Sequence, residues 1–142
     1  MNVFIESAAL WARQTPGWPA WCAAVRGEPT LPATKPNPSL LSANERRRAS
    51  NSVLLALDVA EQAVRASGRD ASQLASVFTS AHGDLSVTDA LCTQLASAPL
   101  QLSPTRFHHS VHNAASGYWA IATGCRAPST AISAHRHSFA SG

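Results

Sequence analysis

The sequence is poor in charge. Only 13% of its 142 residues are charged, lysine occurs once, at Lys35, and the net charge is +3. A nucleic-acid-binding surface needs several basic side chains gathered on one face, whereas the only run of arginines here is Arg46, Arg47 and Arg48. We therefore expect no nucleic-acid partner, and we interpret the arginine run as a solvated or partner-facing helix end.

Long apolar runs and cysteines are scarce as well. Although 45% of the residues are hydrophobic, no stretch approaches the roughly 18 apolar residues of a membrane-spanning helix. The three cysteines, Cys22, Cys92 and Cys125, are odd in number and form no CxxC pair, which argues against a disulfide framework or a zinc knuckle. Glu6 interrupts the apolar run at the N-terminus, unlike the core of a secretory signal. These absences favour a globular, cytoplasmic protein with no membrane partner.

Apolar periodicity and turn residues predict alternating strands and helices. The helix over 43–67 starts at a capping box, Ser42 with Glu45, and stops at Gly68. The strand over 74–80 lacks polar–apolar alternation, as expected of a central strand covered on both faces. The order of elements predicts an α/β fold, a parallel or mixed sheet with helices packed on both faces. The full set is strands over 3–10, 74–80 and 129–134, helices over 18–25, 43–67, 86–96 and 114–123, and a proline-rich loop over 27–39.

Histidines are the first candidates for chemistry. His108 and His112, with His109 between them, are four residues apart, which on a helix places two imidazoles side by side for a metal ion. No HExxH glutamate accompanies them, and a loop histidine satisfied by backbone is the other interpretation. Residues 135–137 (His-Arg-His) form either a solvated turn or a cationic end that meets an acyl or phosphate group. No glycine-rich phosphate loop is present. We expect no cofactor and no resident metal, and keep a small histidine-based metal- or ligand-binding module as an alternative.

The segment SPTRFHHSVHNAASG, residues 103–117, has the most specific pattern. Asn113 can cap the helix over 114–123, whose small residues let it lie close to a neighbour. The segment resembles S-P-x-x-F-x-x-S-V-H-N-A-x-x-G of β-ketoacyl synthases, as do ERRR and VFTSAHGD elsewhere in the chain. The resemblance runs in order from about residue 3 to 142 and is closest to the ketosynthase-like chain-length factors of aryl-polyene and xanthomonadin-type pigment pathways. The matching motif residues are Ser103, Pro104, Phe107, Ser110, Val111, His112, Asn113, Ala114 and Gly117.

The resemblance implies a thiolase-like fold that acts as a dimer. In catalytic members a cysteine lies on a sharp strand-to-helix turn after the G-P-S-type strand, where the helix N-terminus lowers the pKa of its thiol. That position falls near Arg136, and neither it nor His135 or His137 is a cysteine. The resemblance therefore implies no catalytic residue here. It implies a non-catalytic subunit that forms a heterodimer with a ketosynthase, with an acyl carrier protein as a further candidate partner. An active acyltransferase with an unidentified nucleophile is the alternative.

The resemblance also predicts one incomplete domain over residues 1–142. The chain stops at Gly142, where the helix after the nucleophile turn should begin, so we expect the C-terminal half of the fold to be missing. Apolar faces of the long helix and of strand 129–134 would then be exposed, and such patches mark interfaces or instability. We expect residues 80–95 and the SVHNA segment to face the partner, and the chain alone to be poorly soluble.

Overall fold

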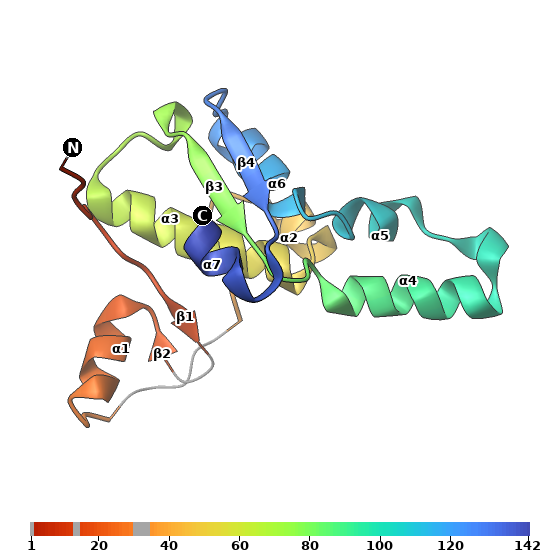
Figure 1. Cartoon of the computed structure of the whole chain (residues 1–142), viewed down its shortest axis with the longest axis horizontal. Coiled ribbons are helices and arrows are strands. Elements are labelled where there is room, and N and C mark those ends of the chain that lie inside the picture. Colours follow the sequence, from red (N-terminus) through yellow and green to blue (C-terminus); the bar gives the residue numbers. More distant parts are fainter. Residues whose placement is uncertain (1, 13–14, 30–34) are drawn as a thin grey trace.

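The structure, a computed structural model, describes residues 2–12, 15–29 and 35–142. Its N-terminal part contains an antiparallel pair of two-residue strands, β1 (Trp11–Ala12) and β2 (Thr15–Pro16), followed by the helix α1 (Trp18–Val25). The helix predicted over 18–25 is thus confirmed, yet α1 buries none of its side chains. Figure 1 shows this part lying to one side of the remaining elements.

The strand predicted over residues 3–10 is absent, so that prediction is wrong. A strand exists through hydrogen bonds to a neighbouring strand, and among the described residues none pairs with this segment. Side-chain bonds hold it instead. The Ser7 hydroxyl donates to the Ala63 carbonyl at 2.8 Å, and Glu6 pairs with Arg69.

The helix predicted over 43–67 is split in two. The two helices are α2 (Ala43–Arg48) and α3 (Asn51–Ser67). The predicted capping box is confirmed, because the Ser42 amide donates to Glu45 Oε2 at 2.8 Å and the Glu45 amide to Ser42 Oγ at 3.3 Å. The break arises because Ala49 is extended, with φ −65° and ψ 145°, and because Ser50 caps a second helix start.

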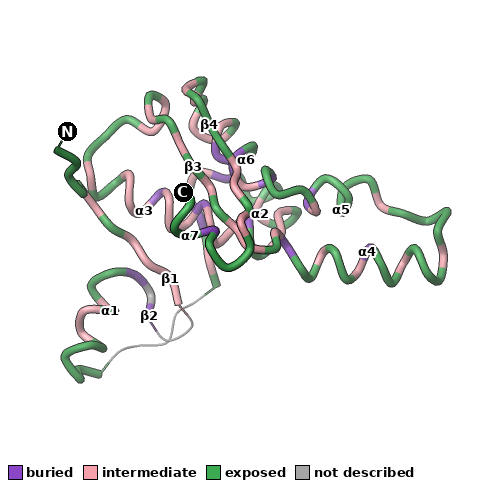
Figure 2. The backbone as a smooth tube through the Cα atoms, in the orientation of Figure 1, coloured by how far each residue is buried: buried purple, intermediate pink, exposed green. Residues whose placement is uncertain are grey.

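The hydrophobic core lies where α3 packs against α6 (Ala114–Thr123). Leu57 is fully buried and Trp119 is 3% exposed. Figure 2 shows that buried residues concentrate on these two helices, whereas α1 is largely exposed. As predicted, α3 ends at Gly68, whose φ of 70° lies in the left-handed region that favours glycine. The buried apolar residues of the core are Leu41, Val53, Leu57, Ala114 and Trp119.

Two parallel strands, β3 (Ser76–Thr79) and β4 (Ser129–Ile132), form the sheet beside this core. They confirm the strands predicted over 74–80 and 129–134, although both are shorter. In the register, Ser76 lies beside Ser129. The sheet described by the structure is therefore parallel, one of the two arrangements predicted, and it has two strands, while β1 and β2 pair separately.

One face of the sheet is covered by helices and the other is partly open. Phe78 points into the core, where its ring centroid lies 6.4 Å from that of Trp119 at an interplanar angle of 58°. On the opposite face Val77 is 53% exposed, although the short helix α7 (Ser138–Ser141) lies against β3. Helices therefore contact β3 on both faces, as predicted, but the short α7 leaves Val77 partly exposed.

A long crossover joins β3 to β4. Its elements are α4 (Leu85–Ser97), the 3-10 turn η2 (Pro99–Gln101), α5 (Pro104–His109) and α6. The helix predicted over 86–96 is confirmed as α4. His108 and His109, for which a loop was one of the two interpretations, lie in the helix α5. The helices α4 and α5 lie side by side and project beyond the sheet (Figure 1). We call this projection, residues 85–109, the α4–α5 arm. Leu100 on it is 100% exposed and Phe107 is 66% exposed.

The helix predicted over 114–123 is confirmed as α6, but its predicted cap is wrong. The side chain of Asn113 makes no capping bond, because its backbone is near-helical (φ −87°, ψ 8°) rather than extended. Its carbonyl instead accepts from the Gly117 amide at 3.0 Å and from the Ser116 hydroxyl at 2.9 Å.

After β4 the chain makes a 3-10 turn, η3 (His135–His137), and enters α7. The last strand therefore runs directly into a turn, as the sequence predicted. In the described part of the chain, no helix combines the length and the apolar character needed to cross a membrane.

Candidate functional site

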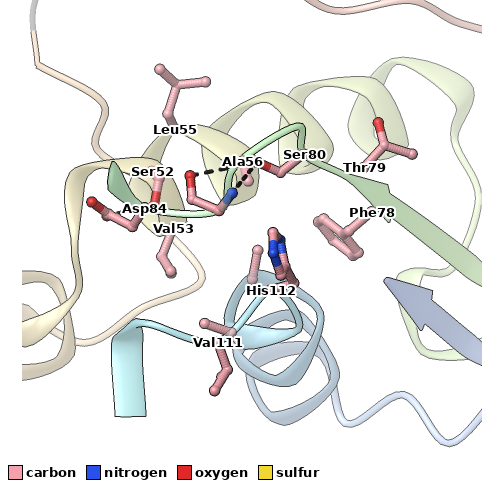
Figure 3. Close-up of a pocket in the computed structure, with 13 residues that line it drawn as sticks. Ser52, Val53, Leu55, Ala56, Phe78, Thr79, Ser80, Asp84, Val111 and His112 are labelled. Atoms are coloured by element: carbon pink, nitrogen blue, oxygen red, sulfur yellow. Dashed lines mark hydrogen bonds between the residues drawn. The ribbon is translucent and has the colours of Figure 1, made fainter. Parts of the chain in front are cut away.

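A mostly apolar cavity of about 270 Å³ opens at the carboxyl end of β3. Its walls come from α3, from β3 and the turn after it, and from the segment that leads into α6 (Figure 3). Because α/β proteins bind ligands at the carboxyl ends of parallel strands, this cavity is the candidate functional site. Its lining includes Ser52, Phe78, Asp84, Val111 and His112.

Asp84 is the carboxylate in the cavity wall, and it is 7% exposed. It accepts hydrogen bonds from the Ser52 hydroxyl at 2.7 Å, the Ser86 hydroxyl at 2.6 Å and the Val87 amide at 3.1 Å. Ser52 belongs to α3, whereas Asp84 is the N-cap of α4. The carboxylate therefore clamps the two helices together.

Burial and hydrogen bonding act in opposite directions on the charge of Asp84. Desolvation raises its pKa, but the bonds from Ser86, Ser52 and Val87, with the nearby Ser50 hydroxyl, outweigh desolvation and hold the pKa well below its usual range. The group is thus ionised at neutral pH with its oxygens engaged. A general acid must carry a proton near the working pH, so Asp84 serves as a clamp and not as a proton donor.

The turn after β3 brings His112 into the site. Gly83 has a φ of 63°, and its amide donates to Ser80 Oγ at 2.9 Å, which closes the turn. A Cβ on Gly83 would lie 3.3 Å from His112 Nδ1, so the glycine leaves room for the imidazole against the turn. Figure 3 shows the ring of His112 beside Phe78. His112 is exposed and lines the cavity, so its ring is accessible to a ligand there.

The end of β4 lies next to the same turn. The Ser133 hydroxyl donates to the Ala81 carbonyl at 3.1 Å, and the rings of His82 and His135 meet edge to face with centroids 5.4 Å apart. His135 has a φ of 50°, which is uncommon for a residue with a side chain. The two turns at the carboxyl ends of the parallel strands are thus tied together.

Arg136 is exposed within the turn after β4. The cysteines lie elsewhere: Cys22 is on α1, Cys92 on α4, and Cys125 precedes β4. The Cys125 thiol donates to the Leu74 carbonyl at 3.3 Å. Among the residues that the structure describes, no thiol lines the cavity or lies at the carboxyl end of β3 or β4.

The histidines of residues 108–112 do not form one site. His108 and His109 belong to α5 and contact Tyr118 of α6, whereas His112 lines the cavity. His108 and His112 therefore share no helix, which removes the geometric basis for a metal site on that spacing. Within residues 2–12, 15–29 and 35–142, no group of three or more His, Cys, Asp or Glu side chains could hold a metal ion.

The motif residues identified in the sequence are divided between the helix α5, the cavity and a second groove. Ser103 accepts from the Arg106 amide at 3.4 Å and so caps α5. The Ser110 hydroxyl donates to the Phe107 carbonyl at 2.8 Å at the end of that helix, which Pro104 begins. Three motif residues line the cavity: Val111, His112 and Ala114. Residues that line a second groove, between α2, α5 and α6, include Val111, Asn113, Ala114 and Gly117.

Sequence reasoning did not identify the clamp between Asp84 and Ser52. An aspartate directly before an apolar helical run is a capping signal, and it could have identified Asp84. Nothing in the sequence signals that Ser52, 32 residues earlier, would meet it.

Comparison with known proteins agrees with this architecture. A family model described as β-ketoacyl synthase, N-terminal domain, matches residues 18–142. A solved structure, the complex of a ketosynthase (ApeO) with its chain length factor (ApeC) from Xenorhabdus doucetiae, contains a chain similar to this one, with a TM-score of 0.72 and 26% sequence identity. The match covers 95% of this chain and 55% of that chain, so this chain spans little more than half of its relative's length. No curated protein matches. The predicted α/β, thiolase-like fold is confirmed.

Proposed function

Because the chain belongs to the β-ketoacyl synthase N-terminal domain family, we propose that it is a ketosynthase-like, non-catalytic subunit of the chain-length-factor type. In this role it pairs with an active ketosynthase in fatty-acid- or polyketide-like synthesis of an aryl polyene. The SVHNA segment, residues 110–114, and the similarity to a chain of the ApeO–ApeC complex support the proposal.

The observation that carries the proposal is the turn after β4. In a catalytic ketosynthase a cysteine thiolate attacks the acyl carrier thioester, and the acyl chain is then held as a thioester on that cysteine sulfur. At the turn that the family resemblance equates with that position, this chain has His135, Arg136 and His137. Neither an imidazole nor a permanently protonated guanidinium can carry an acyl thioester. We infer that this chain forms no acyl-enzyme and leaves that step to its partner.

The cavity beside β3 suits one end of an acyl chain. Most of its lining is apolar, with Phe78, Val111 and Ala115 among the contributors. Each methylene group gains roughly 0.8 kcal/mol on leaving water, so a few buried carbons hold a chain end in place. At about 270 Å³ the cavity is slightly smaller than the usual ligand pocket of about 300–1,000 Å³, so it fits only part of a chain. The role proposed for it is to help shape the tunnel in which the chain grows.

The surface proposed to face the partner is the α4–α5 arm together with residues 110–114. Exposed apolar side chains on a projecting element, such as Leu100 and Phe107, are typical of protein interfaces. The arm is also poor in charge, with Asp89 and Arg106 as its ionised residues, and interface cores are depleted in charge. A ketosynthase is the proposed partner on this surface. An acyl carrier protein that delivers the acyl chain is a further proposed partner, and we place the pair in the cytoplasm.

Co-expression tests the proposal. The chain is produced with the ketosynthase of the same organism that is most similar to ApeO, and the pair is separated by size-exclusion chromatography. We expect the two proteins to co-elute. Leu100→Glu should weaken the complex, whereas Val25→Glu, an equally drastic change on the 70% exposed Val25 of α1, should leave it intact. A chain that always elutes alone contradicts the proposal.

A further inference from the structure

His109 is the buried residue of α5, with 5% of its surface exposed. Among the described residues, neither of its ring nitrogens has a hydrogen-bond partner. Buried polar groups are nearly always hydrogen-bonded, because an unpaired one loses its contact with water and gains nothing in return. A phenylalanine would fill the same space without that penalty, so a histidine here calls for an explanation.

The ring of His109 joins α5 to α6. It stacks on Tyr118 of α6, with centroids 5.7 Å apart and an interplanar angle of 24°. His108 meets His109 at 5.5 Å and Tyr118 at 6.2 Å, so three rings fill the space between the two helices. Because His109 is the buried residue of its six-residue helix, this stack is the main attachment of α5 to α6.

The charged and titratable groups around His109 come from three further elements. Glu45 and Arg48 of α2 line a groove of about 340 Å³, which is also lined by His108 and by Tyr118 of α6. The charge of Asp84, at the start of α4, also acts on the His109 ring. Desolvation and then the neighbouring His108 lower the pKa of His109. The Asp84 charge and the nearby Arg48 backbone carbonyl, which is not placed to accept a full hydrogen bond from the ring, oppose them without prevailing. The ring is therefore neutral at pH 7.

The direction of the pH effect follows from this environment. The folded state lowers the pKa of His109, so the unfolded or detached ring binds a proton more readily than the packed ring. The stacked arrangement has its full stability above the ordinary histidine pKa, about 6.5, and loses stability as the pH falls below it. The Asp84 clamp titrates in a far more acidic range, so the two effects occur in separate pH windows.

We propose that His109 is a proton-sensitive latch: its neutral ring holds α5 against α6, and its protonation releases α5. Release would also free residues 110–113, which include the cavity-lining Val111 and His112. On the proposed function, the latch would regulate how the α4–α5 arm is presented to the ketosynthase, since α5 is one of the two helices of the arm.

An NMR titration of the 142-residue chain from pH 8 to pH 5 tests the latch. We expect the His109 ring signals to titrate with a midpoint below 6.5, and the nuclear Overhauser contacts between His109 and Tyr118 to disappear over the same range. In His109→Phe the contact with Tyr118 should persist down to pH 5. In His108→Gln, the matched control on the exposed neighbour, the contact should still be lost, but at a different pH because one neighbouring imidazole is gone.

Two results would overturn the latch. One is a His109 midpoint at or above 6.5 in the unsubstituted chain, and the other is an unchanged His109–Tyr118 contact at pH 5. If His109→Phe does not fold, the titration of the unsubstituted chain still shows whether the latch exists. His109→Gln then serves as the second variant that cannot titrate at this position. The titration is done without a ketosynthase, so a negative result contradicts the latch but not the proposed function. Conversely, failure to form a complex with the ketosynthase contradicts the proposed function but not the latch.

Discussion

Replacing Asp84 with alanine should loosen α4 from α3. The change removes the N-cap of α4 and the bonds from Ser52 and Ser86, which are 2.7 Å and 2.6 Å long. A lost N-cap costs about 1 kcal/mol, and each hydroxyl bond to a carboxylate contributes roughly 1.5 kcal/mol. Part of this is offset because the variant no longer buries a charge. We expect the free energy of unfolding to fall by about 3 kcal/mol.

Urea unfolding followed by the fluorescence of the four tryptophans measures this loss. Asp84→Asn keeps the shape of the side chain and should have a smaller effect. Asp70→Ala is the matched control, because Asp70 is an exposed cap that accepts from the Ser72 amide at 2.9 Å and bridges no pair of helices. The control should therefore be clearly less destabilising than Asp84→Ala.

The pH dependence provides a second readout for Asp84. Folding lowers its pKa, so its stabilisation is fully present above the ordinary carboxyl pKa, about 3.9, and is lost as the pH falls below that value. The unsubstituted chain should lose stability steeply below pH 4, and Asp84→Asn should lose less over the same range. The reasoning is refuted if Asp84→Ala is no more destabilising than Asp70→Ala, or if Asp84→Asn keeps the full acid dependence.

Three further substitutions test the packing and the proposed interface. Glu61 is 8% exposed and accepts from the Ser39 amide at 2.7 Å and the Leu40 amide at 3.3 Å. Because those donors lose their acceptor in Glu61→Ala, the free energy of unfolding measured in urea should fall by about 2 kcal/mol. Trp119→Ala should cost about 3–5 kcal/mol, or prevent folding as seen by circular dichroism, because it opens a cavity in the core. Leu100→Glu should change the free energy of unfolding by less than about 0.5 kcal/mol, yet raise the dissociation constant for the ketosynthase at least tenfold by calorimetry.

Local signals in the sequence predicted the helices well where a cap or a stop is encoded in neighbouring residues. The capping box at Ser42 and the glycine stop at Gly68 are both present in the structure. The break at Ala49 was missed because the capping box at Ser42 and the apolar pattern that begins at Val53 were joined into one helix. Residues 43–52 contain no large apolar residue, and Ser50 is itself a residue type that caps a helix start.

Features that depend on tertiary contacts could not be predicted in the same way. The N-terminal segment has the composition of a strand, yet a strand also needs a neighbour to pair with, and none is described beside it. The motif around residues 103–117 led to the correct family and to one wall of the cavity. Two further features depend on how separate helices pack, which a local sequence pattern does not predict. They are the opposite wall of the cavity, where Ser52 donates to Asp84, and the stack of His109 on Tyr118.

Mass spectrometry of the reconstituted pair tests the central claim most directly. The chain and its ketosynthase are mixed, loaded with an acyl chain from an acyl carrier protein, and measured first intact under native conditions and then as separate subunits. We predict a complex of one copy of each protein, with the acyl group on the ketosynthase and none on this chain. An acyl adduct on this chain, or the absence of any complex, would contradict its assignment as a non-catalytic partner.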